Sequence, residues 1–215
     1  MENSSINSFA KGSVKLKGQK IPGTLQPKFF GRHTVEVAQD LIGKILVVRK
    51  NPKAPLESPE AKVAVARIVE TEAYRGDDPA SHSCKGETPR SAIMFGEPGY
   101  AYVYFIYGMY EMLNFVTEKK GYPGAVLIRA VEPISGIEHS TNGPGKLCRA
   151  MGIEMSHKGQ RLDGPALFVV EDGYQPKEII TTPRVGIRLA SDTPWRFFEA
   201  GNRFVSKGPK IHGSK

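Results

Sequence analysis

The chain has 215 residues, with 30 Lys and Arg against 22 Asp and Glu, and a net charge of +8. This length suits one domain and is ample for a hydrophobic core. The basic balance fits a polyanionic partner and, equally, a soluble basic protein that binds none. Cys84 and Cys148 lie far apart and outside any CxxC pair, so we expect neither a disulfide framework nor a zinc centre.

The first 26 residues are polar and Lys-rich, without the apolar core of a signal peptide, and no apolar run reaches membrane-spanning length. We therefore expect a flexible basic segment at 1–26, a domain at 27–207 and a tail at 208–215. The domain opens with a short helix in "HTVEVAQDLIGK", with Thr34 as candidate N-cap and Gly43 as stop signal. A strand in "KILVVRK", a Pro-rich loop and a long strand in "VAVARIVETEAY" follow.

A long polar connection at 75–99 comes next, and loops of this length without structure are usually functional or disordered. "YAYVYFIYGMYEMLNFV" predicts a β-hairpin centred on Gly108, because glycine permits the positive φ of a tight turn. The remaining segments predict a strand in "GAVLIRAVEP", a short helix in "NGPGKLCRAMGI" and late strands in "PALFVVED", "PRVGIRLA" and "WRFFEAG". We expect an α+β fold, a single mixed domain with a curved, mostly antiparallel sheet and a protruding hairpin.

Two carboxylates lie within the predicted long strand. Side chains alternate along a strand, so Glu70, Glu72 and Tyr74 should point to one face. Ile68 should point to the same face. A half-buried carboxylate beside an aromatic is unfavourable unless it is ion-paired or used in chemistry, which makes Glu72 either an ion-pair partner or a general base. A glycosidase pair is a weaker alternative, because such acids flank a sugar and neighbours on one strand face seldom do.

Four tyrosines crowd the predicted hairpin: Tyr102, Tyr104, Tyr107 and Tyr110. Cross-strand pairing would explain those within the strands. Tyr107 adjoins the turn, where side chains point into water, and an exposed aromatic on a basic protein suggests insertion between bases. "GPGK" at 143–146 lacks the other residues of a phosphate loop. It is better interpreted as a helix start, which can still bind a backbone phosphate.

The blocks "RIVETEAY", "SHS", "TPRSAIMF", "PGYAYVYFIYGMYEMLNF", "AVLIRAVEP" and "GPGKLCRAMGI" occur in this order. Together they resemble the alkyladenine (3-methyladenine) DNA glycosylases of the mammalian type, over most of the chain from Phe29 to Ser206. The resemblance implies a single mixed α/β domain with a protruding hairpin, unlike the helix-hairpin-helix glycosylases. It also implies a monomer that acts on double-stranded DNA containing damaged purines, without cofactor, metal or membrane. The expected location is the cytoplasm, with the chromosome, in a bacterium, or the nucleus in a eukaryote.

The resemblance assigns roles to residues around a pocket for a flipped base. Glu72 matches the general base of the family. Tyr74, His82 and Tyr104 match the aromatic walls that sandwich the base. Asn114 matches the pocket asparagine that screens purines at the 2-position.

Further residues match positions that contact the DNA itself. Tyr107 corresponds to the hairpin-tip residue that fills the gap in the duplex, and Met94 to a residue that wedges near the opposite strand. Arg129 corresponds to a phosphate-binding arginine near the lesion. Arg90 and Lys146 are further candidates for phosphate binding.

The implied reaction is that of a monofunctional glycosylase in base excision repair. It flips out 3-methyladenine, 7-methylguanine, hypoxanthine or ethenoadenine and hydrolyses the N-glycosidic bond. Two alternatives stay open. A bifunctional glycosylase and lyase needs a lysine nucleophile, and residues 69–74 and 102–115 contain none. A non-enzymatic damage-binding protein would not need Glu72.

Overall fold

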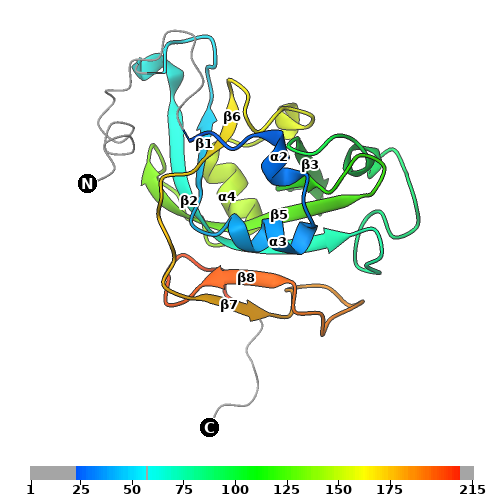
Figure 1. Ribbon diagram of the computed structural model, residues 1–215. Helices are drawn as coiled ribbons and strands as arrows, with labels where there is room; N and C mark the ends of the chain where they lie inside the picture. Colours follow the sequence, from blue (N-terminus) through cyan, green and yellow to red (C-terminus); the bar gives the residue numbers. More distant parts are fainter. Residues whose placement is uncertain (1–22, 57, 209–215) are drawn as a thin grey trace.

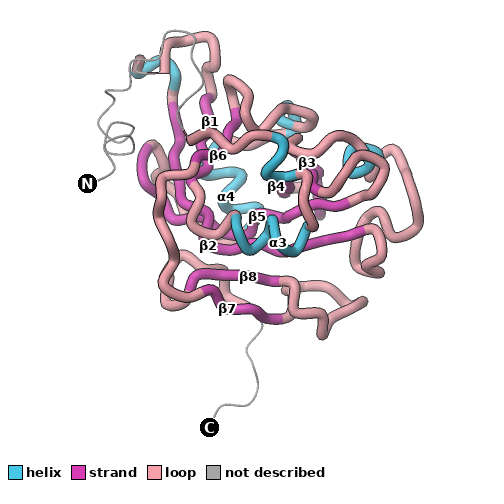
Figure 2. Tube along the Cα trace, viewed as in Figure 1, coloured by secondary structure: helices cyan, strands magenta, loops and turns pink. Residues whose placement is uncertain are grey.

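The computed structural model describes residues 23–56 and 58–208. The strands in this part of the chain are β1 (Ile45–Arg49), β2 (Val63–Arg75), β3 (Ala101–Ile106), β4 (Tyr110–Thr117), β5 (Gly124–Ser135), β6 (Leu167–Val170), β7 (Ile179–Thr182) and β8 (Arg196–Glu199). The helices are α2 (Pro27–Phe30), α3 (Thr34–Asp40) and α4 (Pro144–Met151). Three short 3-10 turns, η1 (Pro59–Ala61), η2 (Ala92–Phe95) and η3 (Met155–His157), complete the described elements (Figures 1 and 2).

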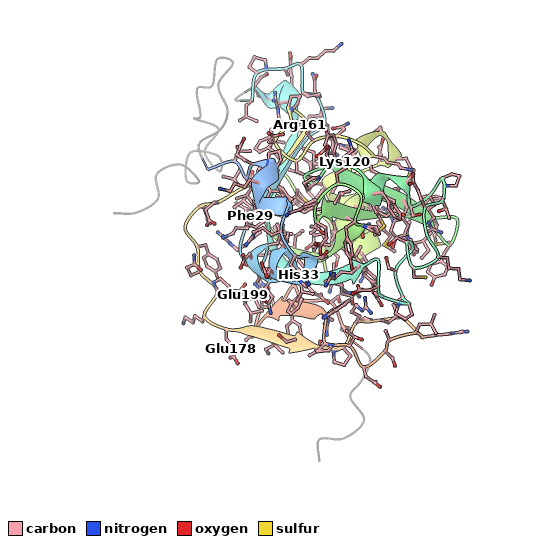
Figure 3. The ribbon with its side chains drawn as sticks, turned by 45° about the vertical axis from the view of Figure 1, so that its right-hand side comes forward. Phe29, His33, Lys120, Arg161, Glu178 and Glu199 are labelled. Atoms are coloured by element: carbon pink, nitrogen blue, oxygen red, sulfur yellow. The ribbon has the colours of Figure 1, made fainter. Side chains whose placement is uncertain are left out.

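The strands form a sheet of order β3-β4-β5-β2-β1-β6, and every pair among the described strands is antiparallel. The long strand β2 pairs with β5 on one side. On its other side it pairs first with β1 and then, further along, with β8, which also pairs with β7. Figure 3 marks this β7–β8 layer by Glu178 and Glu199 and shows it beneath His33, at the start of α3. This curled antiparallel sheet with few helices confirms the predicted fold class (Figure 1).

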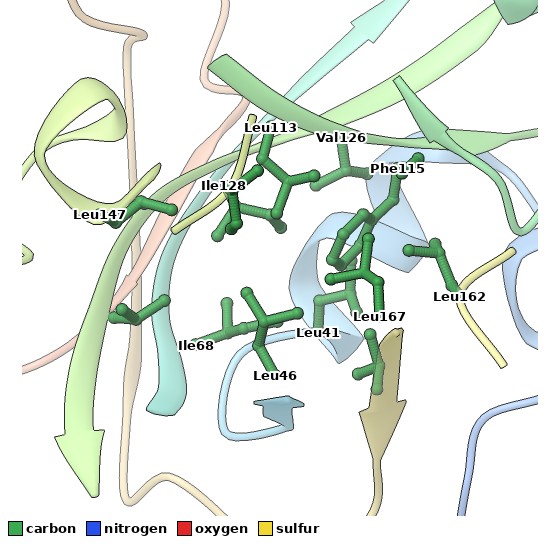
Figure 4. Close-up of a cluster of buried hydrophobic side chains, with 14 of the residues drawn as sticks. Leu41, Leu46, Ile68, Leu113, Phe115, Val126, Ile128, Leu147, Leu162 and Leu167 are labelled. Carbon is green, nitrogen blue, oxygen red and sulfur yellow. The ribbon is translucent and has the colours of Figure 1, made fainter. Parts of the chain in front are cut away.

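One apolar cluster joins the sheet to its two longer helices. Helix α3 packs on β2 and β5, and α4 packs on β4 and β5. Figure 4 shows side chains of this cluster that are at most 1% exposed: Leu41, Leu46, Ile68, Leu113, Phe115, Val126, Ile128, Leu147, Leu162 and Leu167. Each such burial stabilises the fold by about 1.5–3 kcal/mol, so β2, β4 and β5 form a firm platform for their polar side chains.

The predicted hairpin is confirmed, with its turn at Gly108. Tyr107 has φ 54° and Gly108 has φ 67°, the combination that a type I′ turn requires. The Met109 amide donates to the Ile106 carbonyl at 3.2 Å and closes the turn. Tyr107 is 79% exposed, so the hairpin presents an aromatic ring at its tip.

A bulge in β2 changes which residues face the core. Ile68 and Ala73 both belong to the main apolar cluster, although strict alternation puts residues five apart on opposite faces. Register shifts between Ile68 and Glu70, and between Glu70 and Thr71, explain this arrangement. The prediction that Ile68 shares the face of Glu72 is therefore wrong. Ile68 faces the core, whereas the carboxylates after the bulge lie on the other face.

Two local predictions also need correction. Helix α3 begins at Thr34 rather than after it, and its N-terminus is held by Glu118, which accepts hydrogen bonds from the Thr34 amide and hydroxyl, each at 2.8 Å. Residues 183–190 form a loop between β7 and β8 instead of a strand. Pro183 offers no N–H for a strand ladder, and Gly186, with φ 78°, leaves the extended conformation.

The predicted segment at 1–26 and the tail at 208–215 lie almost entirely outside the described residues. At the described end of the first segment, the Leu25 amide donates to the Val169 carbonyl at 2.8 Å, and Thr24 forms a β-bridge with Val170 in β6. Pairing with the sheet therefore begins before residue 27. None of the described helices has the length and apolarity needed to span a membrane.

Candidate active site

A cavity of about 320 Å³ opens beside the hairpin, within the size range of small-molecule sites. Its walls come from β2, the β3–β4 hairpin, β5, η2 and the connection before it, the start of α4 and the β7–β8 loop. The residues predicted for the site that line it are Tyr74, His82, Met94, Tyr104, Tyr107, Asn114 and Arg129. The structure therefore brings together side chains that are up to 55 positions apart, since Tyr74 and Arg129 meet at the same cavity.

Glu72 lies directly behind the wall of this cavity and is 0% exposed. The Val185 amide donates to its Oε1 at 2.7 Å, and the Tyr74 hydroxyl donates to its Oε2 at 2.8 Å. Arg129 Nη1 lies 3.3 Å from the same Oε2. Tyr74, Arg129 and Val185 all line the cavity, so the carboxylate touches three of its wall residues.

Glu70 is equally buried but serves as an anchor for cations. Arg129 Nε lies 3.1 Å and Arg196 Nε 2.6 Å from its Oε1. The Ser206 amide donates to Oε2 at 2.7 Å and the Ser206 hydroxyl to Oε1 at 2.8 Å. The ion-pair interpretation thus describes Glu70 fully and Glu72 only in part. The two acids share one strand and do not flank the cavity, which disagrees with the glycosidase-pair alternative.

The aromatic wall on the hairpin side is a connected group. The rings of His82 and Tyr104 meet edge to face at 4.7 Å, and those of Tyr102 and Tyr104 lie 5.3 Å apart. His82 Nδ1 is 3.0 Å from the Tyr102 hydroxyl. The Arg90 guanidinium covers the Tyr104 ring at 4.8 Å. Tyr102 was not predicted for the site, although its alternation with Tyr104 in β3 signals a shared face.

The ionisation of these side chains is fixed by their surroundings. Partial burial, and then the positive charge of Arg90, lower the pKa of His82 to about 4. Burial, and then the neighbouring Tyr102, raise the pKa of Tyr104 to about 12. Burial and the adjacent Glu72 carboxylate raise the pKa of Tyr74 well above its ordinary value. Near pH 7 the wall therefore presents a neutral imidazole and protonated phenols.

Asn114 lies within β4, opposite Tyr102 in β3 and Leu127 in β5, and is 4% exposed. Its Nδ2 donates to the carbonyls of Tyr102 and Met112, each at 3.2 Å. The amide is thus held in one orientation at the cavity wall. Asn114 lies inside β4 and not at its end, so it does not act as a strand cap.

Two predicted DNA contacts are buried in this structure. Met94 is 2% exposed and packs with Tyr102, Val116 and Ala125, and its role as a wedge stays a prediction. Arg129 is 7% exposed, with its guanidinium between two carboxylates, rather than on an open phosphate-binding surface. Although burial opposes it, the charges of Glu72 and then Glu70 raise the pKa of Arg129.

The other predicted phosphate ligands are exposed. Arg90 lies over Tyr104 at the cavity. Lys146, in the first turn of α4, donates from Nζ to Asn142 at 3.0 Å. Pro144 at the start of the same helix lines the cavity. Arg90 therefore lies beside a wall residue of the cavity and Lys146 on the helix whose first residue lines it, and their phosphate contacts stay predictions.

The β7–β8 loop supplies wall residues that the sequence did not indicate. Val185, Gly186 and Ile187 line the cavity. Val185 is 113 positions from Glu72, and no periodic pattern connects them. Within the described residues, no group of three or more His, Cys, Asp or Glu side chains is arranged to hold a metal ion.

A family model and several known proteins are similar to this chain over most of its length. A family model described as "Methylpurine-DNA glycosylase (MPG)" matches residues 28–203. A protein of Methanocella arvoryzae is 47% identical over 196 residues, which cover 83% of this chain and 94% of its own. A protein of Anaeromyxobacter sp. strain Fw109-5 is 49% identical over 191 residues, which cover 86% and 93%. Both carry the name "Putative 3-methyladenine DNA glycosylase".

These matches and the architecture define a DNA glycosylase, an enzyme of DNA repair whose substrate is DNA. The chain belongs to the methylpurine-DNA glycosylase family, and the predicted resemblance is confirmed.

Proposed function

We propose that this protein is a monomeric, monofunctional glycosylase that flips alkylated or deaminated purines out of duplex DNA and hydrolyses their N-glycosidic bond. The expected lesions are 3-methyladenine, 7-methylguanine, hypoxanthine and ethenoadenine. The observation that carries the proposal is the position of Glu72, a fully buried carboxylate directly behind an aromatic cavity. The Val185 amide and the Tyr74 hydroxyl each donate to one of its oxygens, so the carboxylate is held in one orientation.

The hairpin tip supports a role in base flipping. Tyr107 combines 79% exposure with φ 54°, an uncommon backbone conformation for a bulky side chain. Neither feature stabilises the free protein, and such strain concentrates at functional sites. A damaged base unstacks more easily than a normal one, and the Tyr107 ring then occupies the vacated stack. The net charge of +8, with Arg90 and Lys146 near the cavity, favours phosphate contacts.

The cavity wall suits an electron-poor purine. Tyr74 and Tyr104 offer aromatic faces, which attract a cationic alkylated base. His82 is neutral near pH 7, because its pKa lies at about 4, so it does not repel that cation. A base that carries no positive charge gains less from these faces and needs a proton or hydrogen bonds to leave.

The chemistry follows from the place of Glu72. Oε2 of Glu72 contacts two residues that line the cavity, Tyr74 and Arg129, so we place the attacking water at this part of the wall. Glu72 takes a proton from this water while the oxygen of the water bonds to C1′ of the deoxyribose. The N-glycosidic bond breaks and its electron pair leaves with the purine. The carboxylate charge also stabilises the positively charged sugar in the transition state.

The lining of the cavity favours simple hydrolysis over a lyase reaction. Among the described residues that line it, none is a lysine able to attack C1′ and form an imine. The test is incubation with a lesion-bearing duplex, with and without alkali, and with borohydride. We expect a free base, strand cleavage only after alkali and no trapped adduct. A nick without alkali together with an adduct would indicate a lyase, and intact DNA would indicate a binding protein.

A further inference from the structure

A buried ion pair outside the cavity connects three of its walls. The side chains of Asp78 and Arg184 are 1% and 0% exposed and come from loops 106 positions apart. Arg184 Nη2 donates to Asp78 Oδ1 at 2.9 Å, and Nη1 contacts the second carboxylate oxygen. Nη1 also donates to the Ala73 carbonyl at 2.8 Å. The fork of the guanidinium is thus fixed by two partners at once.

The pair is positioned against the two groups that hold Glu72. The Arg184 guanidinium lies 4.7 Å from the centre of the Tyr74 ring, whose hydroxyl donates to Glu72 Oε2. The next residue along the chain, Val185, donates its amide to Glu72 Oε1. Both hydrogen bonds to the carboxylate therefore come from groups in direct contact with, or bonded to, Arg184.

Asp78 extends the same support to a third segment of the cavity wall. Its Oδ1 accepts from the Ala80 amide at 3.0 Å, and Ala80 lines the cavity. Trp195 closes the other side of Arg184, with 5.3 Å between its ring and the guanidinium. A buried ion pair is a weak stabilising device, because desolvation opposes the attraction between the charges. The contacts of this pair are better explained by the fixed positions that they give to the groups around Glu72.

We propose that the Asp78–Arg184 pair is a positioning pair for Glu72: it holds the Val185 amide and the Tyr74 hydroxyl on the two carboxylate oxygens. The proposal rests on the role of Glu72 given above. Loss of the pair lets the carboxylate shift, and a displacement of about 1 Å can lower a rate roughly 100-fold. Binding of DNA depends on the exposed surface, so the chemical step suffers more than affinity.

The chain contains a matched control pair. Arg67 forms a bidentate pair with Asp172, at 3.1 and 2.8 Å, and stacks on Tyr174 at 4.0 Å. The side chains of Arg67 and Asp172 are also mostly buried, 13% and 7% exposed. Neither they nor Tyr174 line the cavity. A variant of this pair therefore loses a similar interaction without touching the site.

The experiment compares Asp78→Asn, Arg184→Lys and Asp172→Asn in the full chain. Arg184→Lys keeps the charge and removes the fork. Single-turnover excision of hypoxanthine at saturating enzyme, the Kd for the same duplex and the thermal midpoint are measured for each. We expect both site variants to lose roughly tenfold or more in rate, with Kd within about threefold, whereas Asp172→Asn keeps its rate.

Hydrogen exchange of the Val185 amide gives a readout independent of excision. We expect faster exchange in Asp78→Asn and Arg184→Lys, and unchanged exchange in Asp172→Asn, because only the first two release the bond to Glu72. Should Glu72→Gln prove active, the proposed function fails, while this amide still reports on the pair. Rates within about threefold of wild type, an equal loss in the control, or failure of both site variants to fold would each overturn the proposal.

Discussion

Glu70 and Glu72 lie two residues apart in β2 and are both 0% exposed, and apart from Arg129, which contacts both, their partners differ. Glu70 is held by two arginines and by both the amide and hydroxyl of Ser206. Glu72 is held by Tyr74 and Val185, which line the cavity. Glu70 therefore links β2 to β8, whereas Glu72 lies directly behind the cavity, where we propose that it acts as the general base. This division of roles leads to separate predictions for the two.

Glu70→Gln should destabilise the protein, because it leaves Arg196 buried without its carboxylate partner and removes one of the two carboxylates that flank Arg129. Breaking a buried pair commonly lowers the free energy of unfolding by about 3–5 kcal/mol. Urea unfolding measures the loss. Glu97→Gln is the control, since its pair with Lys120 is 59% and 71% exposed and should contribute at most about 1 kcal/mol. Equal effects of the two substitutions would contradict the anchoring role of Glu70.

Tyr107→Ala should shorten the lifetime of the flipped state more than it slows the chemical step. Tyr107 is the most exposed of the large apolar side chains of the hairpin, and a stacked aromatic contributes about 1–3 kcal/mol. Fluorescence of a base analogue at the lesion reports flipping. Tyr107→Phe keeps the ring and should flip like wild type. Unchanged flipping in Tyr107→Ala would assign the wedge to another residue.

The His82 imidazole should titrate with a midpoint near its pKa of about 4, because partial burial and Arg90 oppose its protonation. The unfolded chain binds this proton at an ordinary value of about 6.5. His82 therefore reduces stability progressively as pH falls from about 6.5 to about 4, and not above that window. NMR titration of the ring measures the midpoint, and the urea-unfolded protein gives the reference. A folded-state midpoint near 6.5 would be incompatible with the described wall.

Asn114→Ser should admit guanine to the cavity. The amide is fixed on two carbonyls at the wall, so it cannot turn aside for the 2-amino group that distinguishes guanine from hypoxanthine. A smaller serine relieves this crowding, and steric discrimination of this kind amounts to about 1–3 kcal/mol. Release of guanine from a G·T mispair is compared with release of hypoxanthine. A guanine-to-hypoxanthine ratio that does not rise in the variant would exclude Asn114 as the gate.

The sequence predicted those features of the fold that local patterns encode. The hairpin follows from Gly108 between two apolar strands, and the long strand β2 from its run of β-branched residues. The prediction that Tyr74, His82 and Tyr104 meet at one cavity rested on the resemblance to a family. Spacing alone does not place three separate segments at one cavity.

Long-range contacts could not be predicted in the same way. Val185 reaches Glu72 from a loop 113 positions away, and Glu118 caps α3 from a turn 84 positions away. The bulge at Glu70 breaks the period of two without any glycine or proline to mark it. Met94 matches a wedge position by resemblance, but its burial against Tyr102, Val116 and Ala125 is decided by packing.

The most direct measurement of the central claim is single-turnover excision of an alkylated purine by Glu72→Gln. The amide keeps the shape of the side chain but cannot take a proton from water, so DNA binding should persist. A general base commonly raises the rate of the chemical step about 10²–10⁴-fold, and we expect Glu72→Gln to lower the excision rate by about that factor. A rate within about tenfold of wild type, roughly 1.4 kcal/mol of barrier, would show that Glu72 is not the base.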